Sequence, residues 1–186
     1  MPPMTPPVEH QEVLSFWFED INPKSWWAAA PDFDDLVRSR FGQLLQRVSA
    51  GECCAWRSKP EGRLAEIIVL DQFSRNIHRG SAKAFSQDAM ALTLAQEAVA
   101  QGAHTVLSQI ERSFLLLPYM HSESRVVHQM AEVLYRDHAP EENYKFELRH
   151  KAIIDRFDRY PHRNEALGRT STAAEVEFLK QPGSSF

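Results

Sequence analysis

The sequence predicts a single all-α domain, spanning residues 1–186, that is built from about eight packed antiparallel helices. Prolines and glycines divide the chain into segments of helical length, and apolar residues within these segments recur every three or four positions. Alternating apolar and polar runs, which are typical of half-buried strands, are scarce. A chain of 186 residues, 43% of them hydrophobic, fits one ordinary globular core rather than two.

The first three predicted helices lead toward the centre of the domain. Two prolines near Thr5 favour a helix over residues 5–22, and a second helix is expected from Pro31 to Gly51. A third begins near Pro60 and is apolar on nearly every side through residues 64–73. Because a helix without a polar face is normally buried, this segment is predicted to lie at the centre of the fold.

The second half of the chain contains the remaining helices and one expected break. Pro118 should kink or end a helix, because proline removes a backbone hydrogen bond and clashes with the preceding turn. About residues 1–7 and 181–186 are expected to be flexible tails. The predicted helices span residues 84–101, 108–117, 122–136 and 141–158, with a short last helix after Thr172.

Composition excludes several classes of function. The net charge of -4 does not favour binding to nucleic acid or to an anionic membrane, and no apolar run approaches the roughly 18 residues of a membrane span. The N-terminal residues lack the pattern of a secretion signal, and the two cysteines, Cys53 and Cys54, are adjacent, which fits a reducing cytoplasm. We therefore expect a cytoplasmic protein without a nucleic-acid or membrane partner.

Motifs for metals and cofactors are also missing. The sequence has no Gly-rich phosphate loop, no nucleophile elbow and no His-Glu-x-x-His motif. Glu147 and His150 form a single Glu-x-x-His pattern, whereas a carboxylate-bridged dimetal bundle needs two such motifs and further glutamates. No bound metal and no cofactor are expected, and His150 is predicted to pack between apolar neighbours.

Polar side chains interrupt the apolar face of the third predicted helix. Asp71 and Arg75 continue its apolar stripe and stand four residues apart, so they can form a structural ion pair. The functional interpretation adds Asn76 and Arg79, because this helix end is unusually dense in hydrogen-bonding groups. Both interpretations place an acid and a base near the core.

A second polar cluster follows Pro118. If the helical register continued across the proline, Glu123 would lie on an apolar stripe over residues 116–134, as a half-buried carboxylate that needs a partner. His121 lies beside it and begins a more polar line of side chains. Partly buried histidines and carboxylates are candidates for proton transfer, although a structural histidine is the commoner outcome.

A third polar cluster spans residues 156–164. The hydroxyl-rich segment around Arg169 and Thr172 then precedes the last helix and could cradle an anion, although helix capping and surface ion pairs explain these two residues better. The candidate ligand-binding residues of the cluster are Arg156, His162, Arg163 and Asn164.

Three ordered motifs carry a resemblance to a known family: LDQFSRNI at 70–77, LPYMHSE at 117–123 and RFDRYPHRN at 156–164. Together they resemble the bacterial family catalogued as domain of unknown function 924. The resemblance implies a tetratricopeptide-like α-α superhelix of helical hairpins, although no repeat is visible in the sequence. The family pattern has proline at Ser74 and often glutamate at Met120, so no role is transferred to Met120. The activity of the family is unassigned, so the resemblance implies no reaction.

Two functional hypotheses follow, together with a structural alternative. In the first, the three clusters converge on a site for a small anionic or carboxylate-bearing ligand, with arginines as clamps and His121 or Glu123 as proton carrier. In the second, the chain is a helical-repeat module that holds a peptide or protein partner. The structural alternative is a buried polar network that only fixes the fold.

Overall fold

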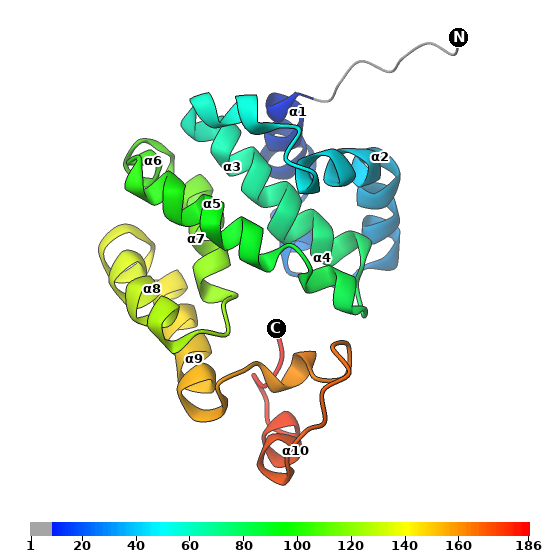
Figure 1. Ribbon diagram of the computed structural model, residues 1–186, viewed down its shortest axis with the longest axis vertical. Coiled ribbons are helices and arrows are strands. Elements are labelled where there is room, and N and C mark those ends of the chain that lie inside the picture. Colours follow the sequence, from blue (N-terminus) through cyan, green and yellow to red (C-terminus); the bar gives the residue numbers. More distant parts are fainter. Residues whose placement is uncertain (1–8) are drawn as a thin grey trace.

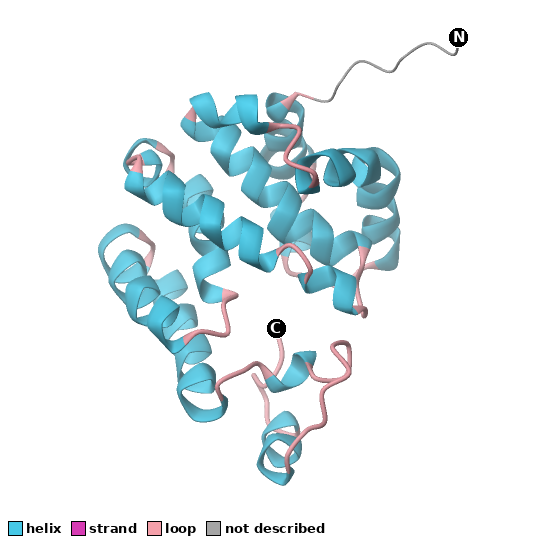
Figure 2. Ribbon diagram, viewed as in Figure 1, coloured by secondary structure: helices cyan, strands magenta, loops and turns pink. Residues whose placement is uncertain are grey.

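The computed structural model describes residues 9–186, and these residues contain helices and loops but no strand (Figure 2). The first predicted helix start and the N-terminal tail at residues 1–7 lie outside the described residues. The helices are labelled α1 to α10 (Figure 1). Because α3 and α4 belong to one continuous helix and α6 is a single turn, the expectation of about eight helices is confirmed. The superhelix implied by the resemblance stays a prediction.

The helices lie close to the predicted segments. Proline at the first position starts α2 and α3, Gly51 follows the end of α2 with positive φ, and Ser108 and Thr172 form capping boxes before α7 and α10. Their bounds are α1 His10–Ser15, α2 Pro31–Ser49, α3 Pro60–Ile68, α4 Ser74–Ile77, α5 Asp88–Ala100, α6 Ala103–Val106, α7 Gln109–Met120, α8 Arg125–His138, α9 Glu141–Phe157 and α10 Ala173–Leu179.

The central helix is the one that the sequence predicted. A π-helical turn, Val69–Phe73, joins α3 to α4 without a break, so the helix continues through Ser74. Residues 64–73 are all buried, and this confirms the prediction of a central segment. The helix crosses the middle of the molecule and brings its polar end, from Asp71 onward, to the region where α5 begins (Figure 1).

The prediction of a break at Pro118 was wrong in its position. Helix α7 continues through Pro118 to Met120, and the break comes in residues 121–124, after which Ser124 caps α8. Pro118 has no N–H to donate to the Phe114 carbonyl, so α7 lacks one backbone hydrogen bond in its last turn and ends two residues later. The stripe over residues 116–134 is therefore interrupted, and Met130 is exposed.

The C-terminal part of the chain lies below α8 and α9 and returns toward the middle of the molecule (Figure 1). In the expected tail at 181–186, Ser184 is buried and the Phe186 ring packs 3.7 Å, centroid to centroid, from the His150 ring, and the flexibility of this segment stays a prediction. An aromatic residue gains free energy by covering another ring, and this explains why the segment folds back. No helix in residues 9–186 is long and apolar enough to cross a membrane.

Candidate functional site

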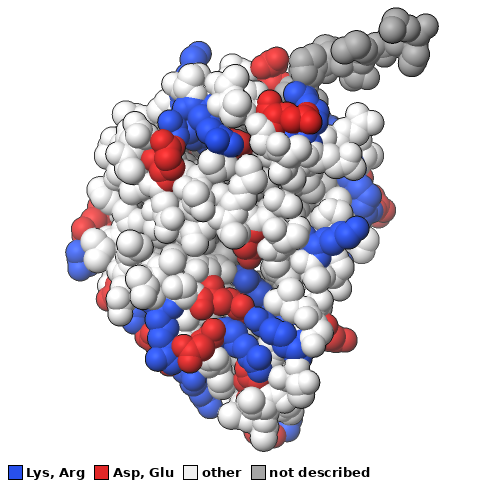
Figure 3. All heavy atoms as spheres, in the orientation of Figure 1, with Lys and Arg blue, Asp and Glu red and all other residues white. Residues whose placement is uncertain are grey.

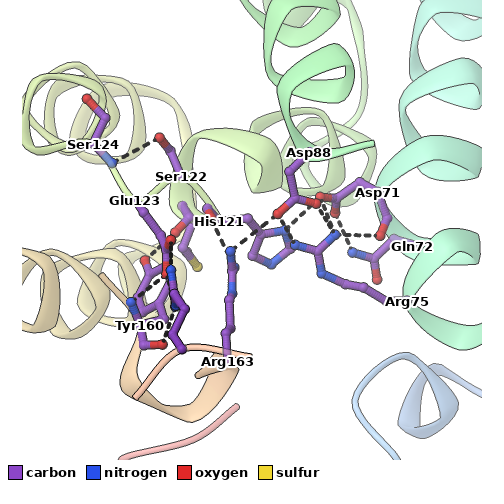
Figure 4. A network of polar contacts seen from close by, with 12 residues as sticks. Asp71, Gln72, Arg75, Asp88, His121, Ser122, Glu123, Ser124, Tyr160 and Arg163 are labelled. Carbon is purple, nitrogen blue, oxygen red and sulfur yellow. Dashed lines mark hydrogen bonds and ion pairs between the residues drawn. The ribbon is translucent and has the colours of Figure 1, made fainter. Parts of the chain in front are cut away.

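Four separate parts of the chain meet in one polar network (Figure 4). The central helix contributes Asp71 and Arg75, the first residue of α5 is Asp88, the break between α7 and α8 contributes His121, and a 3-10 turn at Pro161–Arg163 contributes Arg163. All three polar clusters of the sequence therefore supply at least one side chain. Charged residues of both signs gather over the lower half of the face seen in Figure 3, where these elements meet.

The core of the network is a hydrogen bond between Asp71 and His121. Asp71 Oδ1 lies 2.7 Å from His121 Nδ1, and the Asp71 carboxylate also accepts from Gln72 at 2.7 Å and from Arg75 Nη1 at 3.1 Å. Burial alone would raise the pKa of Asp71, but the charge of Arg75 and the contacts with His121 and Gln72 outweigh burial and lower it well below its usual range. Asp71 is therefore an anion that accepts hydrogen bonds from three donors.

The protonation of His121 follows from this contact. Because an ionised carboxylate can only accept, the proton must sit on His121 Nδ1. Burial and the charge of Arg75 lower the pKa of His121 below its ordinary value, so the ring is neutral at pH 7 and Nε2 carries a free lone pair. Nε2 makes no hydrogen bond to residues 9–186 and is not among their fully buried unpaired atoms. It is the one basic nitrogen of the network that solvent or a ligand can reach.

Two guanidinium groups lie beside the imidazole. Arg75 donates to both oxygens of Asp88 at 2.9 and 3.0 Å, and Arg163 donates to Asp88 at 3.3 Å and to the backbone carbonyl of His121 at 3.0 Å. The Arg163 guanidinium is stacked between the rings of Phe85, at 4.7 Å, and Tyr160, at 4.6 Å. Burial and the charge of Arg75 lower the pKa of Arg163. Sequence analysis missed Asp88 and Phe85, because neither belongs to a motif.

Glu123 is a half-buried carboxylate that is held by hydrogen-bond donors from two parts of the chain. It accepts two hydrogen bonds from Arg169, at 2.7 and 2.9 Å, and one from the backbone N–H of Tyr160, at 2.7 Å. Burial would raise the pKa of Glu123, but these hydrogen bonds outweigh it and lower the pKa. A carboxylate with three donors and a lowered pKa is a poor proton carrier at neutral pH, so the geometry favours His121 over Glu123 for that role. Arg169 also donates to Asn164, which makes Asn164 part of the same structural connection.

Four further predicted residues lie outside the network. Asn76 donates one hydrogen bond to the Asp34 carboxylate of α2, at 2.8 Å, and Arg79 donates two, at 2.6 and 2.9 Å. These contacts join α2 to the end of the central helix. Arg156 lies over the Phe157 ring at 4.6 Å, at an exposed position next to α10. The His162 ring packs near Phe186, at 4.6 Å between centroids, and has no contact with the carboxylates of the network.

A second buried pair, which the sequence did not indicate, supports the loop that holds His121. His128 Nδ1 lies 2.7 Å from Glu147 Oε1, and His128 Nε2 lies 2.8 Å from the carbonyl of Ser122 and 3.1 Å from the Tyr160 hydroxyl. Both side chains are fully buried, and burial raises the pKa of Glu147. Because the Ser122 carbonyl only accepts, Nε2 carries a proton, and the pair shares a second proton between Nδ1 and Glu147.

Two hollows of the surface are bordered by residues that do not belong to the network. A shallow one of about 520 Å³ is bordered by Arg156, Arg159 and α10, and one of about 360 Å³ lies between α2 and α4. In residues 9–186, no three His, Cys, Asp or Glu side chains are placed to hold a metal ion. The chemistry of the site is thus set by one imidazole, two guanidinium groups and two carboxylates.

Comparison with known proteins gives the family. Residues 13–183 match the model of a family described as "Bacterial protein of unknown function (DUF924)". The structure is similar to that of a protein of unknown function, ATU0120, from Agrobacterium tumefaciens, with a TM-score of 0.87 and 30% sequence identity over 92% of this chain and 96% of that one. No curated protein matches the chain. The chain belongs to the DUF924 family.

Proposed function

We propose that the protein binds a small anionic molecule beside His121 and that His121 accepts a proton from this molecule or from a water bound next to it. The observation that carries the proposal is the state of the imidazole, which is held through Nδ1 by a buried carboxylate while Nε2 remains free. A carboxylate that fixes the tautomer and orientation of a histidine, and stabilises its protonated form, is a recurrent arrangement of general bases.

The preference for an anion comes from the two arginines. Arg75 and Arg163 share one partly exposed carboxylate, Asp88, whose side chain is 20% exposed. Arg163 is almost completely buried and its Nε has no hydrogen-bond partner in residues 9–186, so its charge is incompletely satisfied. A carboxylate or phosphate group that approaches from the side of Asp88 would supply the missing acceptors, because guanidinium groups bind such oxyanions in pairs of hydrogen bonds.

Chemical modification of histidine tests the central observation. Diethylpyrocarbonate acylates an unprotonated, accessible imidazole nitrogen, so His121 is expected to react, whereas His128, whose two nitrogens are both engaged, is expected to be protected. Peptide mapping by mass spectrometry reads out each histidine separately. An unmodified His121 under conditions that modify the partly exposed His138 would contradict a free Nε2.

A thermal-shift screen with small carboxylates and phosphates tests the binding step. A ligand that binds only the native state must raise the melting temperature, by an amount that corresponds to about 2.7 kcal/mol at a concentration of 100 Kd. The matched variants are Arg163→Gln, expected to lose the shift, and His121→Asn, expected to keep it because asparagine can still donate to Asp71. If no anion raises the melting temperature of the wild type, the proposal fails.

The second candidate function, an interaction module, is favoured by one apolar stripe. Val126, Met130 and Val133 follow each other at helical spacing along α8 and are 63%, 50% and 47% exposed. A photo-crosslinking residue at Met130 should then capture a partner in cells, and one at Glu177 of α10 serves as the exposed control. Equal labelling at both positions would argue against the module.

A further inference from the structure

The hollow between α2 and α4 has features of a second binding site. It has a volume of about 360 Å³ and is bordered by α2, by the end of the central helix and by the chain that precedes α5. This volume lies at the small end of the range for ligand pockets. None of its lining residues belongs to the Asp71–His121 network, although Gln87 of its rim directly precedes Asp88. The hollow is therefore independent of the proposed function.

Ser74 on the central helix supplies a buried hydroxyl without a partner. Its side chain borders the hollow, the residue is 1% exposed, and Oγ makes no hydrogen bond to residues 9–186. A buried hydroxyl that lacks a partner is unfavourable, and serine in a helix often avoids this by bonding to a carbonyl of the preceding turn. Ser74 does not do so, and its hydroxyl therefore has an unsatisfied donor and acceptor within residues 9–186.

Gly42 gives a second, independent observation. It lies in the middle of α2 and borders the hollow, and a Cβ built on it would meet no atom within 4 Å. Glycine in a helix interior is less favourable than alanine, and here neither close packing nor a positive φ explains it. Because Gly42 borders the hollow, a large side chain at this position would occupy part of its space.

The chemistry of the lining indicates an uncharged guest. The residues that border the hollow include hydroxyl, amide and imidazole groups but no carboxylate and no lysine. Arg38 is the only charged one; its guanidinium is paired with Asp35 and donates to the backbone carbonyl of Ile77 at 2.8 Å. Burial and the nearby cations Lys83 and Arg38 lower the pKa of His78, which supports a neutral ring there. Leu45 and Ile77 add apolar surface.

We propose that this hollow binds a small uncharged polyol, of the size of a monosaccharide or cyclitol. Neutral hydroxyl and amide groups around an apolar floor can donate to and accept from several hydroxyls of one ring, while the ring's C–H faces contact the apolar residues. The lack of a free cation disfavours phosphate or carboxylate, and the lack of a carboxylate disfavours an amine.

Ligand-observed NMR with glucose, ribose and myo-inositol tests the proposal. At least one of the three is expected to bind the wild type, and Gly42→Leu, whose side chain fills the hollow, is expected to weaken binding at least tenfold. Gly42→Ala is the matched control: it should bind like the wild type and raise the melting temperature by about 2 °C, because alanine favours the helix. Ser74→Ala should weaken binding about fivefold if its hydroxyl contacts the polyol.

The outcomes separate this site from the proposed function. His121→Asn should leave polyol binding unchanged, because His121 does not border the hollow. Failure of all three compounds to bind the wild type overturns the proposal, as does a folded Gly42→Leu variant that binds like the wild type. If Gly42→Leu does not fold by circular dichroism, Ser74→Ala decides, and unchanged binding in that variant overturns the proposal.

Discussion

Arg75 connects two carboxylates that differ in their exposure. The side chain of Asp71 is 2% exposed, and that of Asp88 is 20% exposed. The i, i+4 spacing predicted the contact with Asp71, and the structure confirms it, with Arg75 Nη1 also donating to the Asp71 backbone carbonyl at 2.8 Å. The same side chain therefore has a structural role toward Asp71 and faces the proposed ligand through Asp88.

The substitution Arg75→Ala measures the structural part of this role. It leaves Asp71 with donors from Gln72 and His121 but without the charge that balances it. We expect a loss of about 3 kcal/mol in the free energy of unfolding, the low end for a broken buried ion pair. Urea unfolding provides the measurement.

Arg136→Ala serves as the control, because its pair with Asp137 is exposed and its loss should leave the free energy of unfolding close to that of the wild type. A loss below about 1 kcal/mol for Arg75→Ala would show that Arg75 mainly serves a ligand. The sequence alone was enough to design this test, because the spacing of Asp71 and Arg75 predicts their contact.

Other partners could not be predicted, because they come from distant parts of the chain. Asp34 of α2 accepts hydrogen bonds from Asn76 and Arg79, which follow Asp71 in the same polar segment, and these contacts join α2 to the end of the central helix. Asp88 resembles any acidic residue at a helix start. A pattern along one helix identifies polar residues near the core but does not say which neighbour satisfies them.

Among the elements, the segment after α9 is held by two arginine–carboxylate pairs. Arg169 binds Glu123 in the break between α7 and α8, and Arg159 binds both oxygens of Glu175 in α10 at 2.6 and 2.7 Å. Both pairs are bidentate, and two parallel hydrogen bonds make such contacts geometrically specific. The first pair fixes the segment to the rest of the protein, whereas the second lies within it.

Arg169→Ala should therefore loosen the segment while leaving the main core intact. We expect faster amide hydrogen exchange in residues 158–171, with little change in α3, because local opening needs less free energy than global unfolding. Hydrogen-exchange mass spectrometry gives the comparison. In Arg159→Ala, the faster exchange should instead centre on α10; the same exchange pattern in both variants would contradict separate roles for the two pairs.

The helices themselves were predictable from periodicity and end signals, because burial of one face imposes a spacing that the sequence shows directly. The position of the break near Pro118 was not. The rule that proline ends a helix concerns the helix interior, and α7 places its proline in the last turn. The sharp turn at residues 121–124 depends on the Ser122 carbonyl and the His128–Glu147 pair, and no local signal reveals this contact.

On the scale of the whole molecule, buried histidines couple stability to pH. Burial lowers the pKa of His162 to about 4 and that of His150 to about 3. Phe186, which lies 3.7 Å from the His150 ring and 4.6 Å from the His162 ring, contributes to covering both. Hydrogen bonds from Arg159, together with backbone and side-chain donors of Thr172, lower the pKa of Glu175 to about 2.

These shifts act in different pH windows. A histidine whose pKa is lowered by folding is protonated at a higher pH in the unfolded state than in the folded state. Its contribution to stability is therefore complete above the ordinary pKa of about 6.5 and is lost as the pH falls toward the folded value. A carboxylate with a lowered pKa stabilises the fold above its ordinary pKa of about 4.3, and this contribution is lost toward the folded value. Stability should therefore begin to decline near pH 6.5, before the carboxylates titrate.

The variant His162→Gln isolates the first window. Because glutamine does not titrate, the decline of the free energy of unfolding between pH 6.5 and about 4 should become shallower, by up to about 3 kcal/mol over the whole interval. Urea unfolding at a series of pH values measures the slope. Glu175→Gln is the control: it should leave the slope between pH 6.5 and 5 unchanged and reduce the further loss below about pH 4.5. A wild-type curve that stays flat down to pH 4.5 would show that His162 is protonated at its ordinary pKa in the folded protein and that the segment ending in Phe186 does not exclude water from it.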